Sequence, residues 1–317
     1  MLDLKDKKIL LELLNNSRTS SSQLAKKVGL SREVTIYRIE KLKKTIIRHF
    51  YTLLNLEKLG FERYSCFLQL KGISPKEENE FMKYLMEHKF ITFIGSNVGK
   101  WNIILDIIVK DQKHLKELLE QIKNQAGKFF ESSIVYASLE LNYYPDKLIG
   151  LKNTKIKISK IYKERKLDKI DKEILYLLTT DSRIEYAELS QKMSMSANAI
   201  KYRLKAMEDA GIIEGYSVSL NFDLLGEIYV AQFKFDSIDE IKLSEYLRKH
   251  EKVIFEDRCL GNENWDAGIG FLCKDSKEFR KQILELKQIF GSNLKLHDIY
   301  ITSEIYKDNI APEGIFI

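Results

Sequence analysis

Two segments of the chain hold side chains that could bind a polyanion and read bases. Lysine and arginine neutralise phosphates, while asparagine, glutamate, serine and threonine can hydrogen-bond to base edges in a groove of duplex DNA. The candidates are Ser31, Arg32, Glu33, Thr35, Tyr37, Arg38, Lys41 and Lys44 in the first segment, and Ser196, Ala197, Asn198, Lys201, Tyr202 and Arg203 in the second. Each set needs an exposed helix to carry it, because the major groove admits a helix.

Other chemistries find no matching pattern. Cys66, Cys259 and Cys273 have no metal-ligand spacing and no even-numbered disulfide framework, so we expect reduced cysteines. The five histidines are scattered along the sequence, and it shows no nucleotide-binding loop and no Ser-His-Asp set. We therefore expect that the protein is not an enzyme and has no catalytic residues, no metal and no cofactor.

The elements that must carry the candidate residues occur twice, because the chain is a tandem duplication. Short runs recur in the same order about half a chain apart. The matches include Leu2-Asp3 with Leu167-Asp168, Ser17-Arg18 with Ser182-Arg183, Tyr37-Arg38 with Tyr202-Arg203, Leu59-Gly60 with Leu225-Gly226, and Trp101 with Trp265. Solenoid repeats are about 20–50 residues long, so each copy here is long enough for two small domains instead.

The first part of copy 1 has the pattern of three short helices. An apolar stripe over Ile9–Leu14 precedes the capping-box sequence Ser20–Gln23, and Gly29 follows as a left-handed helix end. Ser31 is placed to cap a third helix over 32–44. The residues of this helix expected to face the core are Val34, Ile39 and Leu42.

Copy 2 repeats the pattern, with Ser196 as the cap of a helix over Ala197–Asp209 and a wing strand over Ile212–Tyr216, where copy 1 has Thr45–Phe50. Three helices joined by a tight turn form the helix-turn-helix motif, whose third helix enters the major groove. The pattern alone would also suit any small helical domain, and some of the charges could simply be solvated.

The second part of each copy alternates strands and helices in the order βαββαβ, the ferredoxin-like arrangement. The expected segments are 64–70, 76–88, 91–96, 101–109, 112–125 and 133–141 in copy 1, and 229–235, 243–250, 253–258, 265–272, 277–290 and 294–302 in copy 2. We therefore predict an α+β fold of two repeats, each a winged helix-turn-helix followed by a ferredoxin-like βαββαβ domain. The predicted domains are 1–54 and 55–145 in copy 1, a basic linker at 146–166, and 167–219 and 220–310 in copy 2. Ile156, Ile158 and Ile161 suggest that part of the linker packs.

Composition and charge set the remaining expectations. The 317 residues are 44% hydrophobic and 31% charged with a net charge of +6, which is typical of soluble globular proteins. Residues 1–50 hold twelve Lys and Arg against five Asp and Glu, whereas residues 167–216 hold seven against nine. Copy 1 should therefore grip phosphates more strongly. The N-terminal segment does not read as a signal peptide and no apolar run would span a bilayer, so we expect a cytoplasmic protein without membrane contact.

These motifs resemble the leucine-responsive regulatory protein / AsnC family, also called feast/famine regulators. The most specific stretch is Asp181-Ser182-Arg183 followed by Gly211–Tyr216 and Leu225-Gly226, and copy 1 matches through Asn16-Ser17-Arg18, Gly29–Ser31 and Leu59-Gly60. The resemblance covers nearly the whole chain, once per copy. It implies a sequence-specific regulator of transcription that binds double-stranded DNA and is modulated by an amino acid or a similar small effector.

The resemblance also implies an effector site and an assembly. Family members pair through the sheets of their βαββαβ domains, and the effector binds near a Gly-x-x-Asp loop. The corresponding candidates are Gly99, Trp101, Asn102, Gly261, Trp265 and Asp266. Copy 1 has Asn in place of Asp, and copy 2 has two extra residues in this loop. The alternative is that the glycines only make turns and the tryptophans fill the core.

We expect the two copies to pair within the chain as a pseudo-dimer with unlike recognition helices, and free sheet edges or outer faces would permit further self-association. Two other functions stay open. One is an enzyme similar to the siroheme decarboxylases, which are similar in fold, with Arg48-His49 near the relevant position, where copy 2 has Glu214-Gly215. The other is a partner protein of other regulators with weak DNA binding, which the less basic copy 2 would suit.

Overall fold

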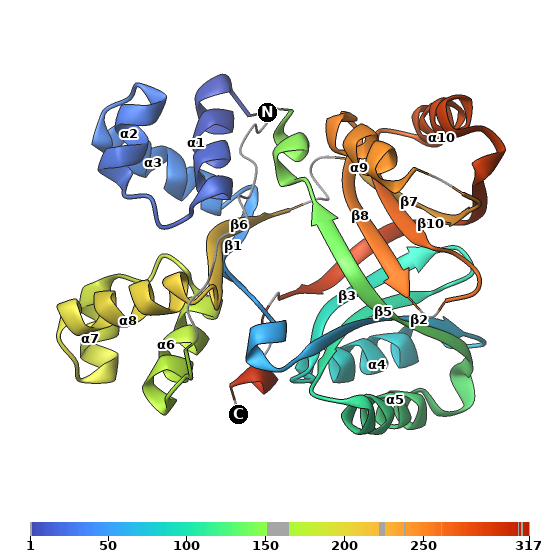
Figure 1. Ribbon diagram of the computed structural model, residues 1–317, viewed down its shortest axis with the longest axis horizontal. Coiled ribbons are helices and arrows are strands. Elements are labelled where there is room, and N and C mark those ends of the chain that lie inside the picture. The colour runs from blue at the N-terminus through green and yellow to red at the C-terminus, as the bar shows by residue number, and fades with distance from the viewer. Residues whose placement is uncertain are drawn as a thin grey trace. The chain divides into compact units, whose positions relative to one another are not determined.

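The computed structural model describes residues 2–150, 165–221, 226–237, 239–260, 262–309, 311 and 313–316. The chain divides into two compact units, and each unit draws on both copies of the repeat. Unit 1 comprises Met1–Gly60, Leu151–Asn221 and Ile310–Ile317, and unit 2 comprises Phe61–Gly150 and Phe222–Asn309. Figure 1 labels the helices and strands of both units.

The described part of unit 1 holds three α-helices and one strand from each copy. These are α1 (Leu4–Asn15), α2 (Ser21–Val28), α3 (Arg32–Lys43) and β1 (Ile47–Leu54) from copy 1, and α6 (Lys169–Thr180), α7 (Tyr186–Met193), α8 (Ala197–Asp209) and β6 (Ile213–Leu220) from copy 2. Serine caps each third helix as predicted, because Ser31 accepts a hydrogen bond from the N–H of Val34, and Ser196 from that of Ala199. Gly29 ends α2 in the left-handed conformation, also as predicted.

One core prediction for α3 was wrong. Ile39 and Leu42 are buried, but Val34 is 41% exposed. Thr35 takes the inward position in the first turn, where its hydroxyl donates to the carbonyl of Ser31 at 2.8 Å. A threonine can satisfy its hydroxyl on the preceding turn of its own helix, which is why it can be buried there.

The strand that follows each third helix is present, and it pairs with the equivalent strand of the other copy. β1 and β6 run antiparallel between the two groups of helices (Figure 1), with Phe50 opposite Val218. Helix α6 of copy 2 lies against β1, and helix α1 of copy 1 lies against β6. Each helical group is therefore completed by a strand of the other copy.

Unit 2 contains the two βαββαβ sequences, so the predicted fold class and element order are confirmed. Copy 1 supplies β2 (Glu62–Leu70), α4 (Pro75–Glu87), β3 (Ile91–Val98), β4 (Ile103–Val109), α5 (Gln112–Ala126) and β5 (Phe130–Tyr143). Copy 2 supplies β7 (Glu227–Phe235), α9 (Glu240–Lys249), β8 (Val253–Leu260), β9 (Ala267–Cys273), α10 (Ser276–Phe290) and β10 (Leu294–Asp308).

The strands of unit 2 form one closed barrel in the order β10-β3-β4-β2-β5-β8-β9-β7. The copies meet at the β5–β8 and β3–β10 pairs. Both β5 and β10 run past their predicted ends to Tyr143 and Asp308, because these extensions form the pairs with the other copy. Closure leaves no unpaired strand edge at these positions.

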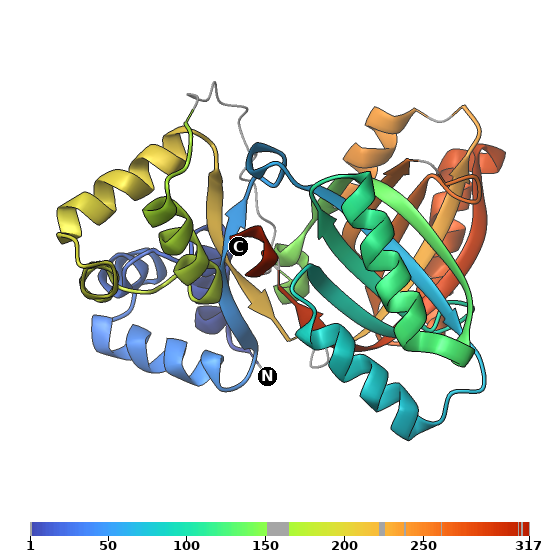
Figure 2. The ribbon, with the colours of Figure 1, turned by 90° about the horizontal axis from the view of Figure 1, so that it is seen from below.

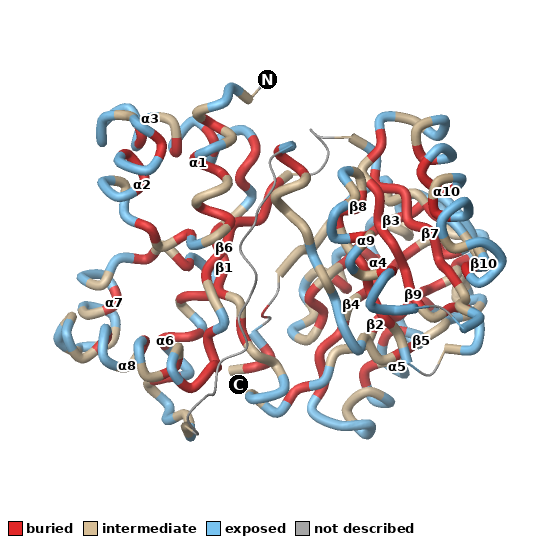
Figure 3. The backbone as a smooth tube through the Cα atoms, turned by 45° about the horizontal axis from the view of Figure 1, so that its top comes forward, coloured by how far each residue is buried: buried red, intermediate tan, exposed pale blue. Residues whose placement is uncertain are grey.

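The helices of unit 2 cover the outside of the barrel (Figure 2), and buried residues concentrate in the strands (Figure 3). Each copy has its own apolar core between helices and strands. The core of copy 1 includes Met82, Leu85, Leu105, Leu118 and Ile122, and that of copy 2 includes Phe233, Leu247, Ile269, Phe271 and Leu286. Apolar residues at helical spacing on the helices and alternate residues on the strands supply both cores.

The predicted linker at 146–166 begins within a short 3-10 helix, Pro145–Ile149. Leu148 and Ile149 are buried, and the Lys147 ammonium donates to the carbonyl of Leu247 at 2.7 Å. Residues 151–164, including Ile156, Ile158 and Ile161, lie outside the described residues. Among the residues that are described, none of the helices has both the length and the apolar character needed to cross a bilayer.

Candidate nucleic-acid interface

Helices α3 and α8 present side chains to solvent at matching positions. Tyr37 and Tyr202 are equivalent, and they are 70% and 75% exposed. Glu33 and Asn198, one turn earlier, are exposed as well. In a helix-turn-helix, the N-terminal part of the recognition helix reaches base edges. Most other candidates are also exposed, namely Ser31, Arg32, Lys41, Lys44, Ser196 and Lys201. Ala197 is half-buried.

Arg38 and Arg203, both candidates for DNA contact, are engaged inside their own helical groups. Arg38 Nη1 donates to Asp3 Oδ2 and Asp6 Oδ1, at 2.7 Å each. Arg203 Nη1 donates to Asp168 Oδ2 at 2.7 Å and Asp171 Oδ1 at 2.8 Å. The N–H of Asp6 and then the Arg38 guanidinium lower the pKa of Asp3. These arginines therefore fasten the third helix of each copy to the N-cap of its first helix, and their charge is already neutralised. Together with the burial of Thr35, this corrects the expectation that all three side chains face DNA.

Two serines and two arginines hold the helical groups of unit 1 together, and we call Ser17, Arg18, Ser182 and Arg183 the Ser-Arg seam. The two serine hydroxyls lie 2.6 Å apart and are fully buried. Arg18 Nη1 donates to the carbonyls of Ser182 and Ile184, at 2.6 and 3.1 Å. Arg183 Nη1 donates in turn to the carbonyls of Ser17 and Thr19.

The Ser-Arg seam was not predicted as a contact, although Ser17-Arg18 recurs in the sequence as Ser182-Arg183. The recurrence was the available signal, because a contact across a two-fold axis requires the same residue in both halves. Burial lowers the pKa of Arg183. An arginine remains charged even so, and its hydrogen bonds to backbone carbonyls compensate for the water it has lost.

Backbone and hydroxyl hydrogen bonds reinforce the same arrangement. The N–H of Ser17 donates to the carbonyl of Tyr216 in β6 at 3.1 Å, and the N–H of Ser182 donates to that of Phe50 in β1 at 3.2 Å. Thr52 of β1 donates through its hydroxyl to Leu178 in α6 at 2.8 Å. The hydroxyl of Ser217 donates to the carbonyl of Leu14 at 2.9 Å. Helices α3 and α8 are thus parts of one bonded unit, which fixes their mutual position within it.

The two recognition helices differ in uncompensated charge. Around α3, Lys27 and Lys43 form ion pairs with Glu12 and Glu40. Around α8, Lys192 pairs with Glu188 at 3.5 Å, Lys205 pairs with Asp209 at 2.8 Å, and Lys201 lies 5.2 Å from the ring centroid of Tyr186. Around α3, Lys26, Arg32, Lys41 and Lys44 form no ion pair with a described carboxylate. Copy 1 therefore has the more positive surface around its recognition helix.

The effector candidates fall in unit 2, where Phe67 brings both tryptophans together inside the barrel. The ring centroid of Phe67 lies 6.1 Å from that of Trp101 and 5.5 Å from that of Trp265. Both tryptophans are buried, and neither indole N–H has a hydrogen-bond partner among the described residues. A buried donor without a partner is uncommon and needs an explanation, such as a bound water or ligand.

The polar residues of the same loops hold the backbone of their own copy. Asn102 Oδ1 accepts from the N–H of Leu70 at 2.6 Å, and Asp266 Oδ2 accepts from the N–H of Phe235 at 2.7 Å. Gly99 adopts φ 150°, and a Cβ there would lie 3.1 Å from Tyr300 Cβ. Gly261 lies outside the described residues. Asn102 and Asp266 thus have equivalent structural roles, and the Asn-for-Asp replacement preserves the bond.

The described residues include no group of three or more His, Cys, Asp or Glu placed to hold a metal ion. The histidines are less dispersed than in the sequence, because the rings of His88 and His114 lie 6.3 and 4.3 Å from that of Phe90. Burial lowers the pKa of His88 and of His250. Burial also raises the pKa of the Cys66 thiol to about 12, so it remains protonated at neutral pH.

Comparison with known proteins agrees with the duplication. The model of the AsnC-type helix-turn-helix domain matches residues 2–43, and a model described as winged helix-turn-helix DNA-binding matches residues 167–214. An uncharacterized HTH-type transcriptional regulator of Pyrococcus furiosus is 31% identical over 146 residues, which are 45% of this chain and 97% of the relative. The HTH-type transcriptional regulator LrpA of Pyrococcus horikoshii is 36% identical over 89 residues, 27% of this chain and 63% of the relative.

Among solved structures, the siroheme decarboxylase NirDL matches nearly the full length. The two share 14% sequence identity with a TM-score of 0.67, and the match covers 98% of this chain and 96% of that one. A second structure of that decarboxylase, in complex with an iron-uroporphyrin III analogue, matches equally well. At this identity the likeness extends to the fold alone.

Proposed function

We infer the function of this chain from its family, because it belongs to the leucine-responsive regulatory protein / AsnC family of DNA-binding transcription regulators. We propose that its two copies replace the two subunits of a dimer and read two unlike halves of one operator. The observation that carries this proposal is the bonding within unit 1. The β1–β6 pair and the Ser-Arg seam hold α3 and α8 together as a two-fold arrangement built from one chain. In unit 2, the β5–β8 and β3–β10 pairs support the same pseudo-dimer.

The exposed faces of the two recognition helices differ in chemistry. On α3, Glu33 could accept from the amino group of cytosine, and the exposed Val34 and Ile36 suit a thymine methyl group. On α8, Asn198 could bond both edge positions of adenine, and Lys201 could donate to guanine. The operator should therefore be asymmetric, because a palindrome needs the same reader at both half-sites.

Phosphate contacts should come mainly from copy 1. Arg32, Lys41 and Lys44 are exposed and form no ion pair with a described carboxylate. Each phosphate that a cation neutralises adds about 0.9 to the slope of log K against log salt. Arg32→Gln and Lys41→Gln should each lower that slope by about one and weaken binding to all sequences alike. Lys113→Gln in α5, whose side chain is 85% exposed in unit 2, is the matched control for loss of one charge.

The test of sequence reading is selection from random duplexes at near-physiological salt, with Tyr37→Ala and Tyr202→Ala as variants. Both tyrosines are exposed, so either change should preserve the fold. Each variant should relax the selected motif in one half-site only, whereas the control Lys169→Ala on α6 should leave the motif intact. A symmetric palindrome would contradict the proposal. Binding without any motif and with steep salt dependence would reduce it to phosphate contact and favour the partner-protein alternative.

The pseudo-dimer predicts that one chain suffices for one operator. Sedimentation of the chain on a selected duplex should give a complex that contains one polypeptide of 37.1 kDa. A complex that forms only with two polypeptides would show that pairing between chains is required. Assembly of the chain into larger particles without DNA would show that it self-associates further. That result would not change the number of polypeptides expected on one duplex.

We also propose that an effector, such as an amino acid, binds beside the Gly99–Asn102 and Trp265–Asp266 loops. The support is the pair of buried indole N–H groups, neither of which has a partner in the part of the chain that the structure describes. Trp101 and Trp265 are the two tryptophans of the chain, so their emission reports directly on this site. Titration with each amino acid should produce a saturable change, and Trp101→Phe and Trp265→Phe should each remove part of it. Unchanged emission with every amino acid at millimolar concentration would exclude this class of effector here.

The second candidate function is an enzyme of the siroheme decarboxylase type. The observation that favours it is the fold likeness to NirDL over 98% of the chain. Titration of the purified protein with siroheme, followed by absorbance and by product analysis, decides the matter. Tight binding with turnover would establish the enzyme, and an unshifted spectrum without product would remove it.

A further inference from the structure

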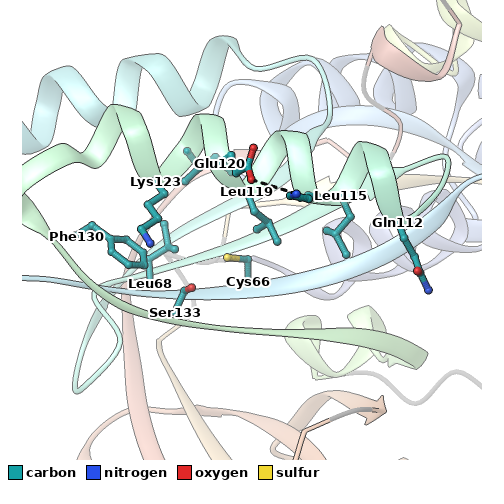
Figure 4. A pocket seen from close by; sticks show the side chains of 11 residues that line it. Cys66, Leu68, Gln112, Leu115, Leu119, Glu120, Lys123, Phe130 and Ser133 are labelled. Carbon is teal, nitrogen blue, oxygen red and sulfur yellow. Dashed lines mark ion pairs between the residues drawn. The ribbon is translucent and has the colours of Figure 1, made fainter.

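A cavity of about 340 Å³ lies between α5 and the strands of copy 1 in unit 2 (Figure 4). Cys66 and Leu68 of β2 line it from the sheet, and Leu115, Leu119 and Ile122 line it from the helix. Ligand sites are commonly apolar concavities of about 300–1,000 Å³ with a few polar groups. The cavity therefore has the size and the lining of a small-molecule site.

Copy 2 carries larger, aromatic side chains at equivalent positions on its strand and helix. At the positions that correspond to Leu68, Leu115 and Ala126, copy 2 has Phe233, Phe279 and Phe290. Phe233 and Phe279 are buried, and the Phe279 ring stacks on Tyr229 with centroids 4.8 Å apart. Two residues that line the cavity in copy 1, Leu68 and Leu115, are therefore replaced by larger buried residues in copy 2.

One end of the cavity carries a positive charge. Figure 4 shows Lys123, Phe130 and Ser133 at this end and Gln112 at the other. The Lys123 ammonium lies 5.1 Å from the ring centroid of Phe130, and no described carboxylate lies within ion-pair distance of it. The other lysine of the lining, Lys116, pairs with Glu120 at 3.8 Å. The free charge of Lys123 beside an apolar cavity complements an acid group on an apolar body.

We propose that this cavity binds a small carboxylate with an apolar body of about ten non-hydrogen atoms, since a volume of 340 Å³ holds about that number at roughly 30 Å³ each. The apolar body lies between Leu115 and Leu68, and the carboxylate pairs with Lys123. This site is separate from the Gly99 and Trp265 loops and does not depend on DNA binding.

The test uses the full-length chain with octanoate and octan-1-ol as probes, followed by titration calorimetry. Octanoate should bind the wild type, and Lys123→Gln should weaken it about fivefold while leaving octan-1-ol unaffected, since the lost pair is charge-dependent. The matched control is Lys287→Gln, which removes the equivalent cation of α10 and should change neither probe. Leu115→Phe, which copies Phe279 of copy 2, should abolish binding of both probes.

Three outcomes would overturn the proposal. They are no octanoate binding at millimolar concentration, equal binding by Leu115→Phe and the wild type, and equal weakening by Lys123→Gln and Lys287→Gln. Circular dichroism checks the fold of Leu115→Phe. If that variant does not fold, the comparison of Lys123→Gln with Lys287→Gln decides the proposal. Parallel DNA-binding measurements separate this result from the proposed function, because either can hold without the other.

Discussion

Replacing Arg18 and Arg183 with methionine should loosen the two helical groups of unit 1. Each guanidinium donates to two backbone carbonyls of the other copy. Methionine retains an apolar chain of similar reach and removes the charge and the donors. The change therefore acts on the hydrogen bonds across the Ser-Arg seam and leaves the helices themselves intact.

The expected magnitude follows from these bonds. A hydrogen bond to a charged group contributes about 1.5–3 kcal/mol, and both bonds of each guanidinium come from the same Nη1, so we count them as little more than one bond. We expect each single change to lower the free energy of unfolding of unit 1 by about 2–3 kcal/mol. The charge of Arg18 helps to lower the pKa of Arg183, so each single change also relieves a repulsion between the two cations. The double variant relieves that repulsion only once, so it should lose somewhat more than the sum of the two single changes. Domains are stable by about 5–15 kcal/mol in total, so the double change should open unit 1 measurably.

Urea unfolding by circular dichroism gives the free energy, and hydrogen exchange read peptide by peptide assigns the loss to unit 1. The matched control is Arg32→Met, because Arg32 is exposed and forms no ion pair with a described carboxylate. In the double variant, the affinity for DNA should fall, and the backbone amides of β1 and β6 should lose protection from hydrogen exchange. Unfolding free energies within about 0.5 kcal/mol of the control would refute the reasoning, since surface substitutions stay within that range.

Three further changes test other parts of the structure. Arg38→Met leaves the buried carboxylate of Asp6 without its cation. It should lower the free energy of unfolding, measured in urea, by about 3 kcal/mol, and adding Asp6→Asn to this variant should restore part of the loss. Burial raises the pKa of Asp257 to about 6, so the folded state holds this proton more tightly than the unfolded state. The stability that protonated Asp257 contributes is present below about pH 4 and is lost as the pH rises through 6. Melting temperatures measured between pH 4 and 7 should show this pH dependence in the wild type, and Asp257→Asn should remove it. Gly99→Ala places a Cβ 3.1 Å from the Cβ of Tyr300 at a φ that L residues rarely adopt. It should lower the free energy of unfolding in urea by about 1–3 kcal/mol, and an unchanged urea midpoint would show that the loop relaxes freely.

The parts of the fold that depend on local hydrogen bonds were predictable from the sequence. The helix predicted over Ala197–Asp209 has those bounds in the structure, because Ser196 caps its start and local signals of this kind lie within a few residues. Ser20 and Gln23 form the predicted capping box of α2. The βαββαβ order also followed from periodicity, with errors at strand ends. Trp101 and Trp265 precede β4 and β9 instead of starting them.

Long-range partners could not be predicted in the same way. The spacing of apolar residues identifies a strand such as β1, but it does not say that its partner is β6. Arg38 has the same sequence pattern whether its guanidinium meets a phosphate or a carboxylate, and only the folded chain brings Asp3 and Asp6 beside it. The cavity under α5 depends on side-chain volumes summed over a helix and two strands, which no local pattern encodes.

The interior of the barrel shows why the two copies are no longer interchangeable. Asp106 of β4 accepts from Arg63 and Ser65, at 2.7 Å each. The position equivalent to Asp106 in copy 2 is Gly270, and a Cβ there would lie 2.1 Å from the ring of Phe255. Copy 2 therefore has no room for a carboxylate on this strand.

Copy 2 supplies its own carboxylate from a different strand, because Asp257 of β8 stands where copy 1 has Gly95. Asp257 accepts from Tyr136 at 3.1 Å and Ser138 at 2.5 Å, both in β5 of copy 1. The charge of Arg63 opposes the effect of burial on its pKa. Two copies of the second half would bury two such carboxylates without that arginine, since Ile228 occupies its position. A buried carboxylate without a cation beside it is destabilising, so the duplicated halves have become complementary, and the paired arrangement within one chain should be more stable than a homodimer of the second half.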